Sequence, residues 1–102
     1  MPALRLLVGT TDGLYELGAR EGSHLNGHEI TALAGDGRWW WALVDGRTLW
    51  RSPDDSSWEK LAELQDAPGT CLAVTTAGLL VGTAGAHLLL LEERRLVRVA
   101  EF

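Results

Sequence analysis

Short runs of apolar and β-branched residues, separated by glycine-rich turns, recur along the whole chain. The first two runs flank Thr11-Asp12-Gly13, which has the composition of a hairpin turn. Glycine stands at nearly every later junction and suits tight turns that need a positive φ. The pattern therefore predicts strands over 4–10, 14–17, 30–34, 39–44, 48–51, 70–75, 79–83, 87–91 and 96–102.

The segment 56–64 carries conflicting signals. Ser56 followed by Glu59 has the spacing of a capping box, and the apolar residues behind it would line one helical face. Its counterpart in the repeat, 96–102, is rich in valine and favours a strand. Because repeats share one conformation, we predict a strand in both places.

Internal repetition organises these strands. Val8-Gly9-Thr10 returns as Val81-Gly82-Thr83, and 58–64 aligns with 96–102 without a gap, 38 positions apart. Three units follow, approximately 3–27, 28–66 and 67–102, with three strands in the first and four in each of the others. Antiparallel four-stranded units of about 40 residues are typical of β-propeller blades.

The predicted fold class is all-β, with residues 1–102 forming a single partial β-propeller of about 2.75 blades. We expect the ring to be completed by oligomerisation or by missing chain. The strands expected nearest the axis, 30–34 and 70–75, carry small residues at Ala32, Ala34, Cys71 and Ala73. Cys71 is therefore expected to point into crowded inner-strand packing and to be inert.

The stretch Ser52-Pro53-Asp54-Asp55-Ser56-Ser57-Trp58 resembles the Asp-box of sialidase-like (BNR) and sortilin-type β-propellers. Ser52, Asp54 and Trp58 match a pattern of roughly Ser-x-Asp-x-Gly-x-Thr-Trp, with Ser56 at the glycine and one position missing. The resemblance implies a structural turn between the third and fourth strands, in which Asp54 accepts backbone N–H groups and Trp58 packs between sheets.

The same resemblance sets out what sialidase chemistry would require. That family uses three arginines, a tyrosine nucleophile backed by a glutamate, and an aspartic acid, all drawn from a complete ring. The one tyrosine of this chain, Tyr15, lies in the middle of a predicted strand, where we expect it to pack. We therefore expect no enzyme activity.

Composition narrows the partners. The chain is 46% hydrophobic and 23% charged, and its 14 acidic against 9 basic residues argue against nucleic acid or an anionic membrane. A single cysteine excludes an internal disulfide, and no Cys/His cluster has zinc spacing. We expect no secretory leader, and no apolar run in the sequence approaches the roughly 20 residues of a membrane span. We expect a cytoplasmic protein without metal or cofactor.

Trp39-Trp40-Trp41 is the most unusual feature of the sequence. In a strand the first and third indoles share one face. Core packing is favoured, and an exposed platform for a sugar ring or a peptide is the alternative. A Ser-His-Asp triad is disfavoured because the sequence has no Gly-x-Ser-x-Gly elbow. A metal site formed by His24, His28 and Glu29 is also disfavoured, because these residues lie in a predicted loop.

Propeller ligands usually bind at one mouth of the central channel. Here that mouth would be built by the loops between second and third strands and between units, whose polar side chains are Asp12, His28, Asp45 and Arg47. We expect a non-catalytic binding or interaction module that self-assembles into a closed ring, a dimer of six blades rather than a trimer of nine. The alternatives are a fragment of a sialidase-like glycoside hydrolase and a lectin-like propeller, with a carbohydrate or peptide as ligand.

Overall fold

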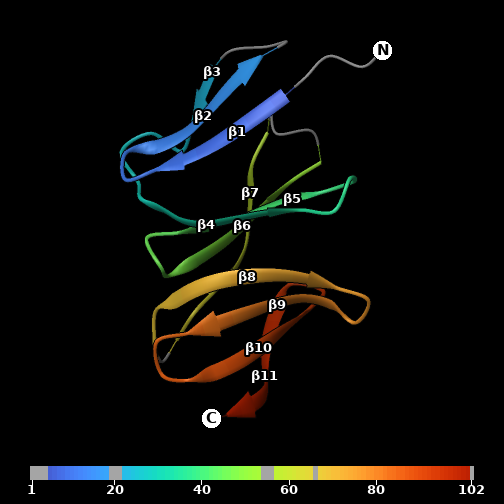
Figure 1. Cartoon of the computed structure of the whole chain (residues 1–102). Helices are drawn as coiled ribbons and strands as arrows, with labels where there is room; N and C mark the ends of the chain where they lie inside the picture. The colour runs from blue at the N-terminus through green and yellow to red at the C-terminus, as the bar shows by residue number, and fades with distance from the viewer. Residues whose placement is uncertain (1–4, 19–21, 54–56, 66, 102) are drawn as a thin grey trace.

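A computed structural model describes residues 5–18, 22–53, 57–65 and 67–101, which form three antiparallel sheets and no helix. The first sheet contains β1 (Arg5–Thr10), β2 (Gly13–Gly18) and β3 (Gly22–His24). The second contains β4 (Ile30–Gly35), β5 (Trp40–Val44), β6 (Thr48–Ser52) and β7 (Glu59–Glu63). The third contains β8 (Gly69–Thr75), β9 (Gly78–Thr83), β10 (His87–Glu92) and β11 (Arg95–Glu101). Figure 1 shows the three sheets stacked in chain order.

The predicted all-β class and the three, four and four strands are confirmed. The strand prediction for the conflicting segment is also confirmed, because β7 occupies its centre. There the capping-box pattern is overridden by ladder pairing between β6 and β7. The chain within each sheet runs from one strand directly to its neighbour, so every sheet is a simple meander.

Two hairpin turns use the same threonine chemistry. In the β1–β2 turn, Thr10 Oγ1 accepts the Asp12 N–H at 3.1 Å and donates to the Gly13 carbonyl at 2.8 Å. Thr75 Oγ1 repeats both bonds, at the same lengths, in the β8–β9 turn. Gly13 and Gly78 close these turns at φ values of 136° and 126°, which other residues rarely adopt.

The cross-strand register identifies equivalent positions in the three sheets. Three leucines lie on the second-from-last strands of the three sheets, β2, β6 and β10. Each is paired with a residue of the preceding strand, in the pairs Leu14–Gly9, Leu49–Leu43 and Leu88–Gly82. The residue after each leucine points to the opposite face of its sheet. These residues form the pairs Tyr15–Val8, Trp50–Ala42 and Leu89–Val81. We call the face with the three leucines the forward face of a sheet, and the other its backward face.

Each forward face packs on the backward face of the next sheet. Leu14, fully buried, joins Ile30, Ala42 and Val44 between the first and second sheets. Two clusters lie between the second and third sheets, one of Trp41, Leu49, Leu61 and Leu79 and one of Leu43, Leu64 and Val81. The two interfaces therefore have the same sense, front to back, along the stack.

The two outermost faces lack such a neighbour. On the backward face of the first sheet, Val8 is 37% and Tyr15 38% exposed, although the equivalent Ala42 and Val81 are fully buried. On the third sheet, Val99 occupies the bulge position that Leu61 fills in the second sheet, and it is 51% exposed. The same positions are thus buried or exposed according to whether another sheet covers them.

Two expectations need correction. The offset of 38 positions holds for the last strand of the unit, but the register of the preceding strands requires 39, as Leu43 and Gly82 show. A slip of one residue exchanges the two faces of a strand. A constant offset of 38 from Trp50 would place Leu88 at the position of Tyr15, and the register places Leu89 there. Cys71 was expected in crowded packing and is exposed, because β8 turns this face toward the uncovered side of the third sheet.

Candidate functional site

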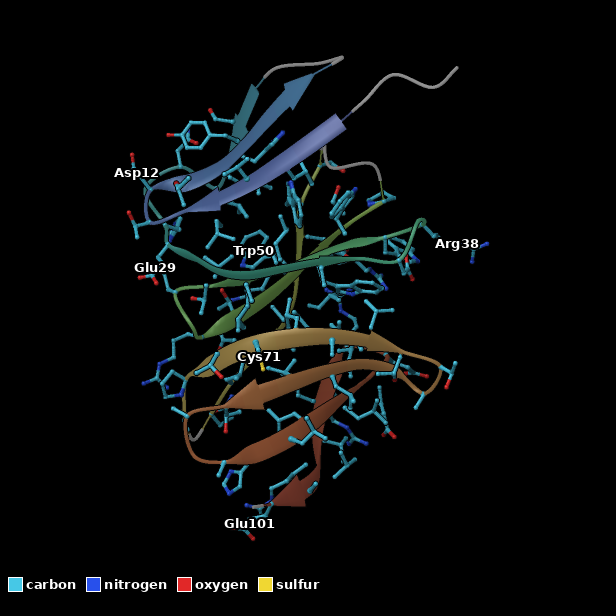
Figure 2. The ribbon with its side chains drawn as sticks, in the orientation of Figure 1. Asp12, Glu29, Arg38, Trp50, Cys71 and Glu101 are labelled. Carbon is cyan, nitrogen blue, oxygen red and sulfur yellow. The ribbon has the colours of Figure 1, made fainter. Side chains whose placement is uncertain are left out.

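The loops that the sequence predicted as one mouth lie together on one side of the stack of sheets. Figure 2 shows Asp12 and Glu29 on this side and Arg38 on the opposite side. We call the strand ends on the first side the Asp45 end and those on the second side the Arg38 end. Backbone hydrogen bonds link successive loops at the Asp45 end, from the N–H groups of Gly27, Asp45, Gly69 and Ala84 to the carbonyls of Asp12, Glu29, Gly46 and Pro68 respectively, at 2.7–3.1 Å.

His28 and Asp45 are the two predicted site residues whose side chains meet. Asp45 Oδ2 lies 2.8 Å from His28 Nδ1, and Asp45 Oδ1 accepts the Glu29 N–H at 2.8 Å. The hydrogen bond from His28, followed by that from Glu29, holds the pKa of the Asp45 carboxyl below its ordinary value. Asp45 has a φ of 54°, which aspartate tolerates better than most residues. The pair therefore ties the loop before β4 to the β5–β6 turn.

The other two predicted residues act through their backbones. The Asp12 carbonyl accepts the Gly27 N–H at 3.1 Å, and the Arg47 carbonyl accepts the Leu64 N–H at 2.7 Å. Both side chains are exposed. The four residues thus lie at one end, and the contacts they make within the described ranges hold loops together.

The Asp-box residues fall where the third and fourth strands of the second sheet connect. Ser52, the last residue of β6, is fully buried, and Trp58, just before β7, packs against the cluster between the first and second sheets. The Trp58 Nε1 atom is buried and has no hydrogen-bond partner among the described residues. Asp54 lies outside the described residues.

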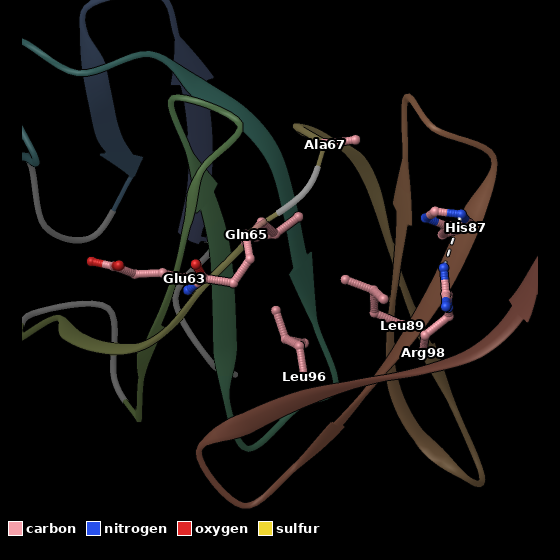
Figure 3. Close-up of a pocket in the computed structure, with 8 residues that line it drawn as sticks. Glu63, Gln65, Ala67, His87, Leu89, Leu96 and Arg98 are labelled. Atoms are coloured by element: carbon pink, nitrogen blue, oxygen red, sulfur yellow. Dashed lines mark hydrogen bonds between the residues drawn. The ribbon is translucent and has the colours of Figure 1, made fainter.

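A groove lies between the end of β7 and the β10–β11 hairpin (Figure 3). Its volume is about 260 Å³, and its lining is Glu63, Leu64, Gln65, Ala67, His87, Leu89, Leu96 and Arg98. His87 Nε2 lies 3.3 Å from Arg98 Nη1 and 3.2 Å from Glu101 Oε2. Because one ring nitrogen faces both a donor and an acceptor, its tautomer decides which of the two it bonds. The groove therefore has a polar rim, formed in part by His87 and Arg98, over a floor of leucines.

A second pocket, of about 300 Å³, opens at the Arg38 end between the second and third sheets. Trp39 and Trp41 share one face, as the alternation predicted, and both line it. Trp41 is only 7% exposed and belongs to the core, whereas Trp39 is half-buried and carries the Arg51 guanidinium 4.0 Å above its ring. The sequence analysis identified the tryptophans and missed Arg51. Arg51 pairs with Trp41 across β5 and β6, so its place on the tryptophan face depends on the register of these two strands.

Within the described ranges, no three His, Cys, Asp or Glu side chains gather closely enough to hold a metal ion. No helix in the same ranges is long and apolar enough to cross a membrane. Comparison of the chain with protein-family models, curated proteins and solved structures finds no match.

Proposed function

We propose that this chain is a non-catalytic interaction module, built of β-propeller blades, that associates with copies of itself front to back. The observation that supports the proposal is the equivalence of faces. The second sheet contacts the third through its forward face. The third sheet has the equivalent positions on its own forward face, where none of the described sheets of this chain covers them. On β1 and β2, the backward face of the first sheet repeats the positions that receive such a contact on β5 and β6 and on β9 and β10. At these positions each free face offers what the other would contact, and the three described strands of the first sheet include no counterpart of β4 or β8.

Burial energetics favour covering these faces. Transfer of apolar surface from water contributes roughly 25 cal/mol per Å². Val8 and Tyr15 at one end of the stack and Val99 at the other keep more than a third of their surface exposed. Repeat units of this kind depend on neighbours to bury such faces.

A contact between unlike faces closes into a ring when the rotation between copies is right. Two chains of three sheets give six blades, inside the common range of about 4–8, whereas three chains give nine. We therefore propose a dimer. In this assembly the Asp45 ends of all blades surround one mouth of a channel, with Asp12 and Arg47 free to contact a ligand.

The test is the mass of the native protein in solution, measured by sedimentation velocity across micromolar concentrations. Wild type should sediment as a dimer. Leu88→Asp places a charge on the free forward face and should give a folded monomer. Ala77→Asp is the matched control, because it adds the same charge in the exposed β8–β9 turn and should remain dimeric. A wild type that is folded and monomeric throughout would refute the proposal.

The resemblance to sialidase-like propellers supplies the competing function. A chromogenic sialoside or pyranoside incubated with purified protein separates the two. The proposed module releases no chromophore above the rate in buffer. Turnover that is abolished by Asp45→Ala would replace the interaction module with a glycoside hydrolase.

A further inference from the structure

We propose that the pocket between the second and third sheets at the Arg38 end binds one neutral pyranose ring. This site lies within a single chain, so it goes beyond the proposed self-association and does not depend on it. The residues that carry the argument are Trp39, Arg51, Asp36 and Glu93, which line the pocket together with apolar side chains.

The apolar wall suits the flat, hydrophobic face of a sugar ring. Trp39 and Trp41 come from the second sheet, and Val74, Leu79 and Leu91 come from the third. An indole offers a large, rigid, electron-rich surface against which C–H groups pack. At about 300 Å³ the pocket is at the small end of ligand sites, so it accommodates a single ring and not an extended chain.

Arg51 is held in place before any ligand arrives. Its guanidinium lies 4.0 Å from the Trp39 ring, and its Nη2 atom lies 3.8 Å from Glu59 Oε1. Arg94, from the β10–β11 turn, bonds the same Glu59 oxygen at 3.2 Å and donates to the Lys60 carbonyl at 2.9 Å. A planar donor fixed on both sides loses little conformational freedom when it binds hydroxyl oxygens.

Two carboxylates provide acceptors. Asp36 Oδ1 accepts the N–H groups of Trp39 at 2.7 Å and Arg38 at 2.9 Å, and these bonds lower the pKa of its carboxyl. Glu93, at a φ of 60° in the β10–β11 turn, lines the opposite wall and is the second acidic residue of the pocket. The pocket therefore presents donors and acceptors from both sheets.

The charge balance decides the class of ligand. An anion would face two carboxylates against one guanidinium. An organic cation placed at the Trp39 ring would lie against the Arg51 guanidinium and be repelled by its like charge, whereas a neutral ring would not. A hydroxyl group both donates and accepts, so a neutral polyhydroxylated ring can donate to the carboxylates and accept from Arg51.

The site is specific to one sheet interface. At the 39-position offset of the second and third sheets, Trp39 and Arg51 correspond to Gly78 and Leu90. Neither the aromatic wall nor the guanidinium recurs on the third sheet. Each chain therefore carries one such pocket at these two sheets, whatever its oligomeric state.

The experiment is a titration of ¹⁵N-labelled protein with the methyl pyranosides of glucose, galactose, mannose and fucose, each added separately. The indole N–H signals of the tryptophans are the readout. At least one pyranoside should give saturable shifts, largest for Trp39 and Trp41, with a Kd on the order of millimolar. Arg51→Lys keeps the charge, loses the planar fork and should weaken binding about tenfold. Arg38→Lys makes the same exchange at an exposed residue outside the pocket and should bind like wild type.

Trp39→Phe should weaken binding less than Trp39→Ala, since it keeps a smaller aromatic face. The proposal is overturned by a lack of saturable shifts with all four pyranosides, or by unchanged affinity in Arg51→Lys. It is also overturned if N-acetyl-leucine amide binds and no pyranoside does, because the pocket then takes an apolar peptide side chain. Native mass is unaffected by any of these outcomes, so failure here is distinguishable from failure of the self-association.

Discussion

Three leucines occupy equivalent positions in the three sheets, and truncating each of them in turn shows how much the covering sheet contributes to the free energy of unfolding. Leu14, Leu49 and Leu88 have the same chemistry and the same cross-strand position. The first two are fully buried by the next sheet, whereas Leu88 lies half-buried on the uncovered forward face. Leu→Ala at each position is therefore an internally matched series.

The structure gives an expected magnitude for each member. A Leu→Ala change in a closed core costs about 2–5 kcal/mol, which combines lost transfer energy with a cavity. We expect about 3 kcal/mol for Leu14→Ala and for Leu49→Ala on this basis. Leu88→Ala removes partly exposed atoms and leaves no enclosed cavity, so an isolated chain should lose only about 1 kcal/mol.

Urea unfolding followed by circular dichroism measures these free energies, at the lowest concentration that gives a signal and again at high concentration. In a self-associating protein the Leu88→Ala cost should grow with concentration, because assembly buries this position. The costs of Leu14→Ala and Leu49→Ala should change little. Equal costs at all three positions in a monomeric sample would refute the equivalence of the faces.

Three further predictions concern single side chains. Asp45→Asn should keep the loop geometry. The pKa of Asp45 is lower in the folded protein than its ordinary value of 3.8, so wild type should be more stable than the variant above this pH and should lose that advantage as the pH falls below it. Urea unfolding at several pH values measures the difference. Trp58→Ala should cost up to about 3–5 kcal/mol, whereas Trp58→Phe should cost much less, since the indole N–H has no partner to lose; equal melting temperatures for both variants would contradict this. Asp54→Ala should cost about 1–2 kcal/mol if it closes an Asp-box turn, and an unchanged melting temperature would argue against that turn.

Strand number and strand order could be predicted because glycine-bounded apolar runs repeat along the chain. The conflict at 56–64 could also be resolved, since a repeat partner with a clear preference outweighs a local capping signal. β3 was counted but not located, because Gly22–His24 is too short and polar to show a two-residue alternation.

Register could not be predicted from the same alignment. The β1–β2 turn places two residues between paired positions and the β5–β6 turn three, so no constant offset fits both. Bulges add one residue to the last strand of a sheet, Leu61 on β7 opposite Leu49 and Trp50, and Val99 on β11 opposite Leu88 and Leu89. Each insertion exchanges faces, which is a tertiary property that linear spacing does not encode.

The candidate site divides in the same way. The loops at the Asp45 end could be grouped from topology alone, and the meeting of His28 with Asp45 then follows from where those loops lie. The Arg51–Trp39 stack depends on the face of β6 and needed the actual register. Exposure of Cys71 depends on the lack of a covering sheet, which is not a property of its own strand.

The constant front-to-back sense of the two sheet interfaces has a consequence for how such a chain can grow. A duplicated copy of the second unit, inserted after itself, would keep the existing contacts with the first and third sheets. It would add one new contact, between the forward face of the second sheet and the backward face of its copy, and both of these faces already pack against a sheet in the parent. Tandem duplication is therefore a short evolutionary step for this architecture, and the number of units per chain can change while the rules of contact between neighbours stay the same.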